Sequence, residues 1–152
     1  MRKRFLTRDA PAPPDWLDIQ SSAEAEVTSE DANFPLESAL AIHPGSGWRA
    51  GEAGTQTIRL RFDHPLSVRR IHLEFREEQH ERTQEFVLSW SDYPGKTSRD
   101  ILRQQFNFNS SATREIEHYS VQLDAVSILE LRMTPDLSRP DALATLRRLQ
   151  IA

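Results

Sequence analysis

The sequence predicts an all-β protein, an antiparallel β-sandwich of the jelly-roll type with about eight strands and an irregular N-terminal arm. Apolar and polar or charged side chains alternate along residues 58–62 and again along 71–75, which is typical of half-buried strands. Turn-forming residues then recur at intervals of roughly 8–12 residues, as they do in sandwiches. Each predicted strand has one apolar face that another layer must cover, which indicates a second sheet.

The length of 152 residues predicts one domain, preceded by an arm. We expect residues 1–22 to be a flexible or docked arm and residues 23–152 to be the sandwich domain. The arm has a basic start and the proline-rich run 11–14. Trp16, Leu17 and Ile19 interrupt it, and they could cap one edge of the core or contact another subunit.

The first third of the chain predicts few regular elements before the long strands. A short strand is expected at residues 25–28, followed by a polar connection at 29–50 with a helical segment at 36–40. Loops of this length inside a compact domain are usually functional or packed on themselves. Two strands follow at 56–62 and 68–75, and Asp63-His64-Pro65 predicts a turn between them.

Four further strands are expected at residues 86–90, 102–108, 119–123 and 129–133, with turns near 92–97 and 124–126 and a loop near 108–114. The C-terminal segment 139–151 gives conflicting signals. Ser138-Arg139-Pro140 suits a helix start, and Leu143, Leu146 and Leu149 have helical spacing. Leu149 and Ile151 alternate as in a closing strand.

The composition narrows the possible partners. A formal net charge of −4 gives no overall attraction to nucleic acid, and the longest apolar runs are far too short for a bilayer span. The chain has no cysteine, hence no disulfide framework or thiolate metal site. The basic residues 2–4 are not followed by the apolar stretch of a signal peptide, so we expect a cytoplasmic protein that binds neither nucleic acid nor membrane.

Several segments, in order, resemble discoidin domains, also called coagulation factor 5/8 type C domains. The resemblance covers about residues 25–151 and is carried by Val27-Thr28-Ser29, Pro35-Leu36-Glu37-Ser38-Ala39-Leu40, Gly47-Trp48-Arg49-Ala50, and the strand sequences at 56–62, 68–73, 85–89, 128–133 and 146–151. It implies a galactose-binding-like jelly roll, a non-catalytic module whose relatives bind glycans, phospholipid head groups or proteins. It also implies a closing strand at the C-terminus and a largely structural Trp48.

Two features depart from the family's pattern. Extracellular members usually carry a cysteine pair, which this chain lacks. Many have aspartate and glycine in a loop that holds calcium, where this chain has His43-Pro44-Gly45. Imidazole is a poor ligand for a hard cation, which disfavours a calcium site without deciding whether a structural calcium is bound. The five histidines are scattered without metal-ligand spacing, so no other metal and no cofactor is expected.

If successive strands are antiparallel, the loops near 29–50, 77–82, 108–114 and 135–144 share one end of the sandwich. Long loops on a rigid scaffold usually carry binding residues, and discoidin relatives also bind ligands at one end. A sugar site needs an aromatic plane and planar hydrogen-bonding groups. The candidate ligand-binding residues at this end are Trp48, Arg49, Gln79, His80, Arg82, Asn107, Asn109 and Arg139.

Structural roles compete with binding for three of these residues. Trp48 could be a lid on the core, Arg82 could form a surface ion pair with Glu81 or Glu85, and His80 could be a solvated loop residue. No phosphate-binding glycine loop, nucleophile elbow or metal-spaced histidine pair occurs. We therefore expect no enzyme but a carbohydrate-binding module, or alternatively an intracellular protein-interaction or scaffold module of the same fold.

Overall fold

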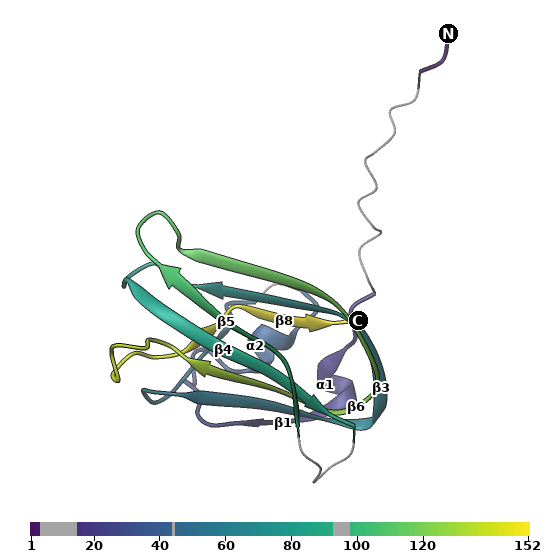
Figure 1. The fold of residues 1–152 in the computed structure, drawn as a ribbon, viewed down its shortest axis with the longest axis horizontal. Coiled ribbons are helices and arrows are strands. Elements are labelled where there is room, and N and C mark those ends of the chain that lie inside the picture. The colour runs from purple at the N-terminus through teal and green to yellow at the C-terminus, as the bar shows by residue number, and fades with distance from the viewer. Residues whose placement is uncertain (4–14, 44, 93–97) are drawn as a thin grey trace.

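The computed structural model, which describes residues 1–3, 15–43, 45–92 and 98–152, is an antiparallel β-sandwich (Figure 1). Every pair of neighbouring strands is antiparallel, so the predicted fold class is confirmed. Most of the predicted arm, residues 4–14, and most of the predicted turn at 92–97 lie outside the described residues. No helix in the described part of the chain is long and apolar enough to cross a membrane.

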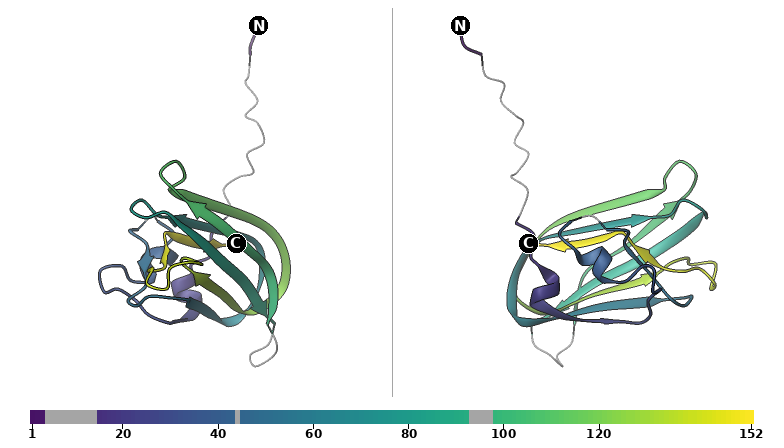
Figure 2. Two further views of the ribbon diagram at one scale, coloured as in Figure 1. Left: turned by 60° about the vertical axis from the view of Figure 1, so that its left-hand side comes forward. Right: turned by 180° about the vertical axis from the view of Figure 1, so that it is seen from behind.

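Two strands of 21 residues each, β3 (Gln56–Arg76) and β6 (Arg114–Thr134), run through both sheets of the sandwich. Their outer portions pair in two blocks, 56–61 with 128–133 and 70–76 with 114–120. The register shifts between these blocks, and both strands curve there from one sheet into the other (Figure 2). Irregular pairing of this kind bends a strand without ending it.

The predicted chain reversals at 63–67 and 124–126 are therefore bends inside continuous strands, and the prediction of separate strands on either side was wrong. Leu66 pairs with Val126 within the two segments expected to leave the sheets, and Val68 pairs with Leu123 directly beside them. Pro65 cannot donate a ladder hydrogen bond, and it lies where the register shifts, the position that a strand proline tolerates.

Within the described residues, one sheet has five strands and the other has three. In the larger sheet, β1 (Ala23–Val27), the first half of β3, the second half of β6, β4 (Arg82–Ser91) and β5 (Arg99–Phe108) lie side by side. In the smaller sheet, the second half of β3 lies between β8 (Arg148–Ile151) and the first half of β6. A two-residue pair, β2 (Trp48–Arg49) with β7 (Thr145–Leu146), stands apart from both.

The core lies between the two sheets and follows the alternation in the sequence. Ile71, Leu73 and Phe75 of β3 are fully buried, and the Phe75 ring lies 5.1 Å from the ring of Phe86 on the opposite sheet. Two short helices, α1 (Ile19–Ser22) and α2 (Glu37–Leu40), add Ile19 and Leu40 to this core. The predicted helical segment at 36–40 is thus confirmed. Each fully buried aliphatic side chain contributes about 1.5–3 kcal/mol to stability.

The C-terminal segment is a strand and not a helix. β8 pairs with β3, which places Leu149 and Ile151 in the core, while Leu143 is 41% exposed. Sheet pairing satisfies the backbone of β8 and outweighs the local helix signals at its start. The strand also holds the end of the arm, because the Leu17 amide donates to the Ile151 carbonyl at 2.8 Å.

Candidate functional site

The long loops gather at the end of the sandwich opposite the bends of β3 and β6 (Figure 1). Backbone hydrogen bonds join them to one another and to the sheets. The Glu77 amide donates to the Thr113 carbonyl, and the Leu137 amide donates to the Thr83 carbonyl. The prediction that these loops share one end is confirmed. β3 and β6 each bend at the far end and run back toward the loops, as two strands joined by a turn would do, so successive loops still lie at alternate ends of the sandwich.

A pocket of about 330 Å³ lies at this end, and we call it the loop-end pocket. It is lined mainly by the segments 77–82 and 136–145, together with Arg49 from β2. Its lining combines three guanidinium groups with four carboxylates: Arg49, Arg82, Arg139, Glu77, Glu81, Asp136 and Asp141. Hydrogen-bond donors and acceptors are therefore both present around one cavity.

Arg82 is the buried cation of this pocket, and its side chain ties β4 to the 136–145 segment. It is 6% exposed and donates to the Leu143 carbonyl at 2.8 Å and to the Thr145 hydroxyl at 3.3 Å. Its Nε–H has no partner, and within the described part of the chain the group forms no ion pair. Burial lowers its pKa. A buried donor without a partner is costly, and this Nε is also closed to solvent, so Arg82 acts on the pocket through its charge.

Asp136 is the buried anion of the same pocket, 6% exposed. Its Oδ1 accepts hydrogen bonds from the backbone amide and the hydroxyl of Ser138, at 3.1 and 3.0 Å. Burial is the largest single influence and raises the pKa of this carboxyl, but the hydrogen bonds from Ser138, the backbone of Thr83 and the charge of Arg139 together lower it. Asp136 is therefore a fixed, ionised acceptor.

Five of the eight candidate residues line the loop-end pocket: Arg49, Gln79, His80, Arg82 and Arg139. Asn109 lies in a smaller hollow of about 120 Å³ that also includes Gln79 and His80. Its side chain already accepts from the Ser111 amide at 2.9 Å. Asn107 borders none of these cavities, because its side chain is exposed on β5 and accepts from Thr83 at 2.7 Å.

Trp48 belongs to the core. Its side chain is 1% exposed, and the indole N–H donates to the Ser29 carbonyl at 3.1 Å. The indole therefore has the structural role that the resemblance implies, and it does not line the loop-end pocket, although it forms part of the wall of a second pocket described below. Burial of Trp48 fixes the two-residue strand β2, and this strand carries Arg49 into the pocket.

In the described structure Arg82 does not form the surface ion pair with Glu81 or Glu85 that the sequence left open as an alternative to a binding role. Glu85 pairs instead with Arg103 at 2.6 Å, while Arg82 turns inward to the Leu143 carbonyl. The four lining carboxylates and Leu143 were not among the candidates. Dense charge in the segments 77–82 and 136–141 was the available signal in the sequence.

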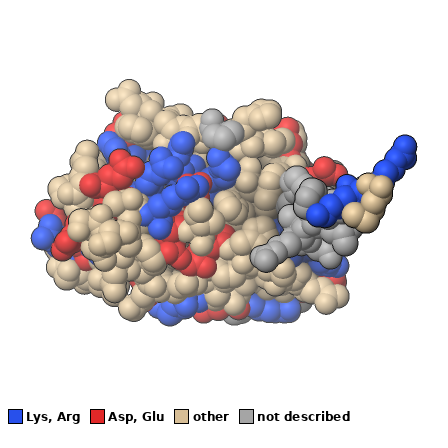
Figure 3. Space-filling view, turned by 90° about the horizontal axis from the view of Figure 1, so that it is seen from above, with Lys and Arg blue, Asp and Glu red and all other residues tan. Residues whose placement is uncertain are grey.

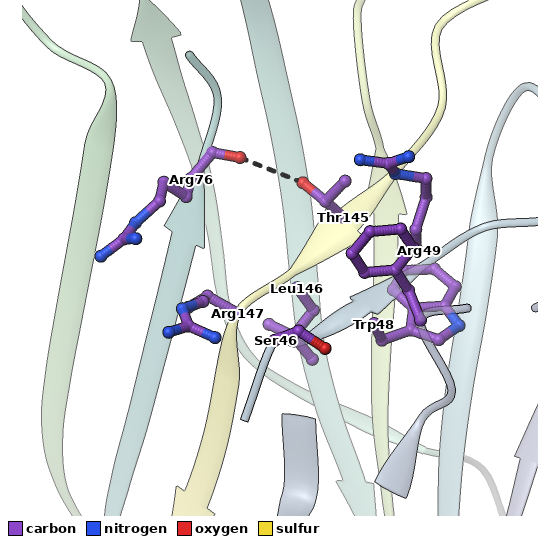
Figure 4. A pocket seen from close by; sticks show the side chains of 8 residues that line it. Ser46, Trp48, Arg49, Arg76, Thr145, Leu146 and Arg147 are labelled. Carbon is purple, nitrogen blue, oxygen red and sulfur yellow. Dashed lines mark hydrogen bonds between the residues drawn. The ribbon is translucent and has the colours of Figure 1, made fainter. Parts of the chain in front are cut away.

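A second pocket of about 250 Å³ adjoins the first, and we call it the arginine pocket (Figure 4). Arg76 and Arg147 project on one side of the strand that carries Thr145 and Leu146, and Arg49 lies on the other. Ser46 and Phe34 complete much of its wall. Arg49 and Thr145 line both pockets, so the two cavities share a wall.

The chain matches no family model, and no curated protein matches it in sequence. Solved structures do match. The family 32 carbohydrate-binding module (CBM32) of AlyQ, in complex with 4,5-unsaturated mannuronic acid, has a TM-score of 0.62 at 15% identity over 86% of this chain and 95% of its own. The family 32 module of C. perfringens NanJ, in complex with galactose, has a TM-score of 0.59 at 13% identity over 88% and 96%.

The C-terminal domain of a chitobiase from Bacteroides fragilis gives a TM-score of 0.65 at 16% identity over 91% of this chain and 97% of its own. The chain has the galactose-binding-like jelly-roll fold of these modules. This confirms the fold that the resemblance to discoidin domains implies, while membership of the discoidin family itself stays a prediction. Similarity at this level of identity establishes the fold, and function must be argued from the site.

Proposed function

We propose that the protein is a non-catalytic carbohydrate-binding module whose ligand occupies the loop-end pocket. The observation that carries the proposal is that a buried cation, Arg82, and a buried anion, Asp136, which do not bond to each other, both line one cavity on this fold. The fold supports it, because structural neighbours are carbohydrate-binding modules described in complex with galactose and with an unsaturated mannuronic acid.

The chemistry of the pocket suits sugar hydroxyls. Each hydroxyl both donates and accepts, so arginine donors beside carboxylate acceptors can satisfy neighbouring hydroxyls of one ring. Arg139 and Asp141 provide such a combination on one loop, with His80 on the facing loop. No aromatic residue lines this cavity in the described structure, so the C–H face of a sugar would pack on Leu143, which is 41% exposed.

The carboxylates of the pocket favour binding over glycoside hydrolysis. A glycosidase needs a carboxylic acid with a raised pKa to protonate the leaving group. Asp136, the buried carboxyl of the pocket, has a lowered pKa, which is the opposite of what such an acid needs. Glu115, whose pKa is raised, lies on β6 and does not line the pocket.

Calorimetric titration tests the proposal. The folded protein is titrated with galactose, the disaccharide N-acetylgalactosamine-β-1,3-galactose, and a mannuronate oligosaccharide, after a glycan array has ranked these classes. We expect saturable binding to at least one sugar. Arg139→Gln should weaken it about tenfold or more, because a charge-assisted hydrogen bond is lost. Arg132→Gln, on the exposed surface of β6, is the matched control. Absence of binding across the array by folded protein would contradict the proposal.

A further inference from the structure

The arginine pocket differs in charge from the loop-end pocket. Three guanidinium groups, from Arg49, Arg76 and Arg147, and two hydroxyls, from Ser46 and Thr145, line it, and no described carboxylate does. Guanidinium groups donate hydrogen bonds and cannot accept them, whereas the Thr145 hydroxyl already donates its hydrogen to the Arg76 carbonyl at 3.2 Å, so the three arginines are the main donors of this cavity (Figure 4). The cavity is therefore complementary to an anionic group.

The guanidinium groups of this pocket are only weakly paired with carboxylates of the protein. Arg49 lies over the Phe34 ring at 4.2 Å, and Arg147 is held by its backbone amide, which donates to the Glu74 carbonyl at 2.8 Å. In the described structure neither guanidinium forms an ion pair. Arg76 lies 3.7 Å from Glu74, but that carboxylate also accepts from Arg114 at the shorter distance of 2.6 Å.

The positive charge continues from the pocket onto the outer face of the smaller sheet. The strand register places Arg114 opposite Arg76, and Arg148 opposite Glu74. The Glu74 side chain is only 4% exposed, so it lies beneath the arginines. Seen from above, basic side chains gather in one patch with a small acidic spot inside it (Figure 3), as expected where arginines cover a single carboxylate. This concentration occurs in a chain whose net charge is −4.

We propose that the arginine pocket binds the carboxylate or sulfate of an acidic oligosaccharide, one unit of which occupies the loop-end pocket. This inference rests on the proposed function, and it adds the class of ligand. The shared wall at Arg49 and Thr145 lets one chain of sugars enter both cavities. Planar guanidinium groups match the paired oxygens of carboxylate and sulfate, which makes arginine the suitable residue for this task.

The test compares two trisaccharides that differ only in charge: oligogalacturonate and the same oligosaccharide with its carboxyl groups reduced to alcohols. Calorimetry with wild-type protein should show about tenfold tighter binding of the acidic form, since each lost charge-assisted contact is worth about that factor. Arg147→Gln should remove this preference and leave affinity for the reduced form unchanged. Arg147→Lys should restore part of it, because the charge returns without the planar fork.

Arg132→Gln, which removes an exposed arginine far along β6, should leave the preference intact. A sulfated galactan trisaccharide tests sulfate against carboxylate, and tight binding of either anion in an Arg147-dependent way supports the inference. Equal affinity for the acidic and reduced trisaccharides would overturn it while leaving the proposed function standing. Equal binding of a single-stranded oligonucleotide, or of vesicles rich in phosphatidylserine, would also overturn it, because the patch would then select charge without sugar.

Discussion

His72 and His118 lie directly opposite each other on β3 and β6, with ring centroids 5.7 Å apart and Nδ1 atoms 3.5 Å apart. The Trp16 ring packs against both imidazoles, with centroids 6.0 and 6.2 Å away. The end of the N-terminal arm thus rests on a histidine pair. The pKa of His72 is lowered, and burial is the largest cause. The nearby charges of His118, Arg148 and Arg114 lower it further, whereas Glu74 raises it.

Acidification should therefore weaken the fold at this contact. A histidine whose folded pKa lies below its unfolded value of 6.5 contributes stability that is complete above pH 6.5 and is lost as the pH falls toward the folded pKa. We expect the wild-type melting temperature to drop between about pH 7.5 and about pH 5 by more than that of His72→Gln. Scanning calorimetry measures the melting temperatures of the two proteins. Tryptophan fluorescence of wild type and Trp16→Phe, compared over the same pH range, identifies the signal that is due to release of the arm. Parallel pH profiles for wild type and His72→Gln would contradict this prediction.

Glu115 should affect stability in the opposite sense to His72, because its carboxyl destabilises the fold as the pH rises. It lies on the inner side of β6, opposite Phe75. Burial, followed by a hydrogen bond and repulsion from Glu117, raises its pKa to about 8. Such a carboxyl contributes stability that is complete below its unfolded pKa of 4.5 and is lost as the pH rises through about 8.

Replacing Glu115 with glutamine keeps the hydrogen-bonding shape and removes the titration. We expect Glu115→Gln to be more stable than the wild type above about pH 8, with the difference shrinking toward about pH 5. Thermal unfolding across this range measures the effect. Glu24→Gln, an exposed position on β1, serves as the control. A constant difference at every pH would show that the carboxyl does not titrate in this range.

Strand faces were predictable from the sequence because burial repeats every two residues. Ile58, Leu60, Ile71 and Leu73 all point into the core as the alternation requires. The bends were not predictable, because turn residues such as Pro65 occur both in reversals and in irregular strands. Only pairing with a distant partner, such as Leu66 with Val126, decides between them.

The site was predictable as a set of loops and not as a set of contacts. Strand alternation assigns the loops to one end, but the role of a side chain depends on its distant neighbours. Arg82 bonds to Leu143, 61 residues away, and Trp48 bonds to Ser29, 19 residues away. Neither partner is marked by a local pattern, so the sequence left two roles open for each residue: an ion pair or a ligand contact for Arg82, and a core lid or a sugar platform for Trp48.

Two glycines give a matched test of the backbone that holds both pockets. Gly47 and Gly54 have φ values of +88° and +93°, the left-handed region in which other residues are strained. A Cβ at Gly47 would lie 2.8 Å from the Leu146 carbonyl oxygen, whereas one at Gly54 would meet nothing within 4 Å. We expect Gly54→Ala to cost about 1–2 kcal/mol from backbone strain alone. Gly47→Ala should cost more, because it also pushes β2 from β7. Urea unfolding compares them, and equal costs would show that the pairing of β2 with β7 can relax.

Arg82 should link the stability of the loop end to its affinity for sugar. Lysine keeps the charge but lacks the planar fork that reaches both Leu143 and Thr145. We expect Arg82→Lys to lower the free energy of unfolding by about 1–3 kcal/mol, because the Leu143 carbonyl or the Thr145 hydroxyl loses its donor. Sugar affinity should fall in parallel, since the 136–145 segment forms one wall of the pocket.

Arg103→Lys, on the exposed side of β5, should change stability by only about 0.5 kcal/mol and leave affinity intact. Urea unfolding and calorimetric titration measure the two quantities separately. Unchanged affinity in a destabilised Arg82→Lys protein would assign Arg82 a purely structural role and move the binding determinants to Arg49 and Arg139.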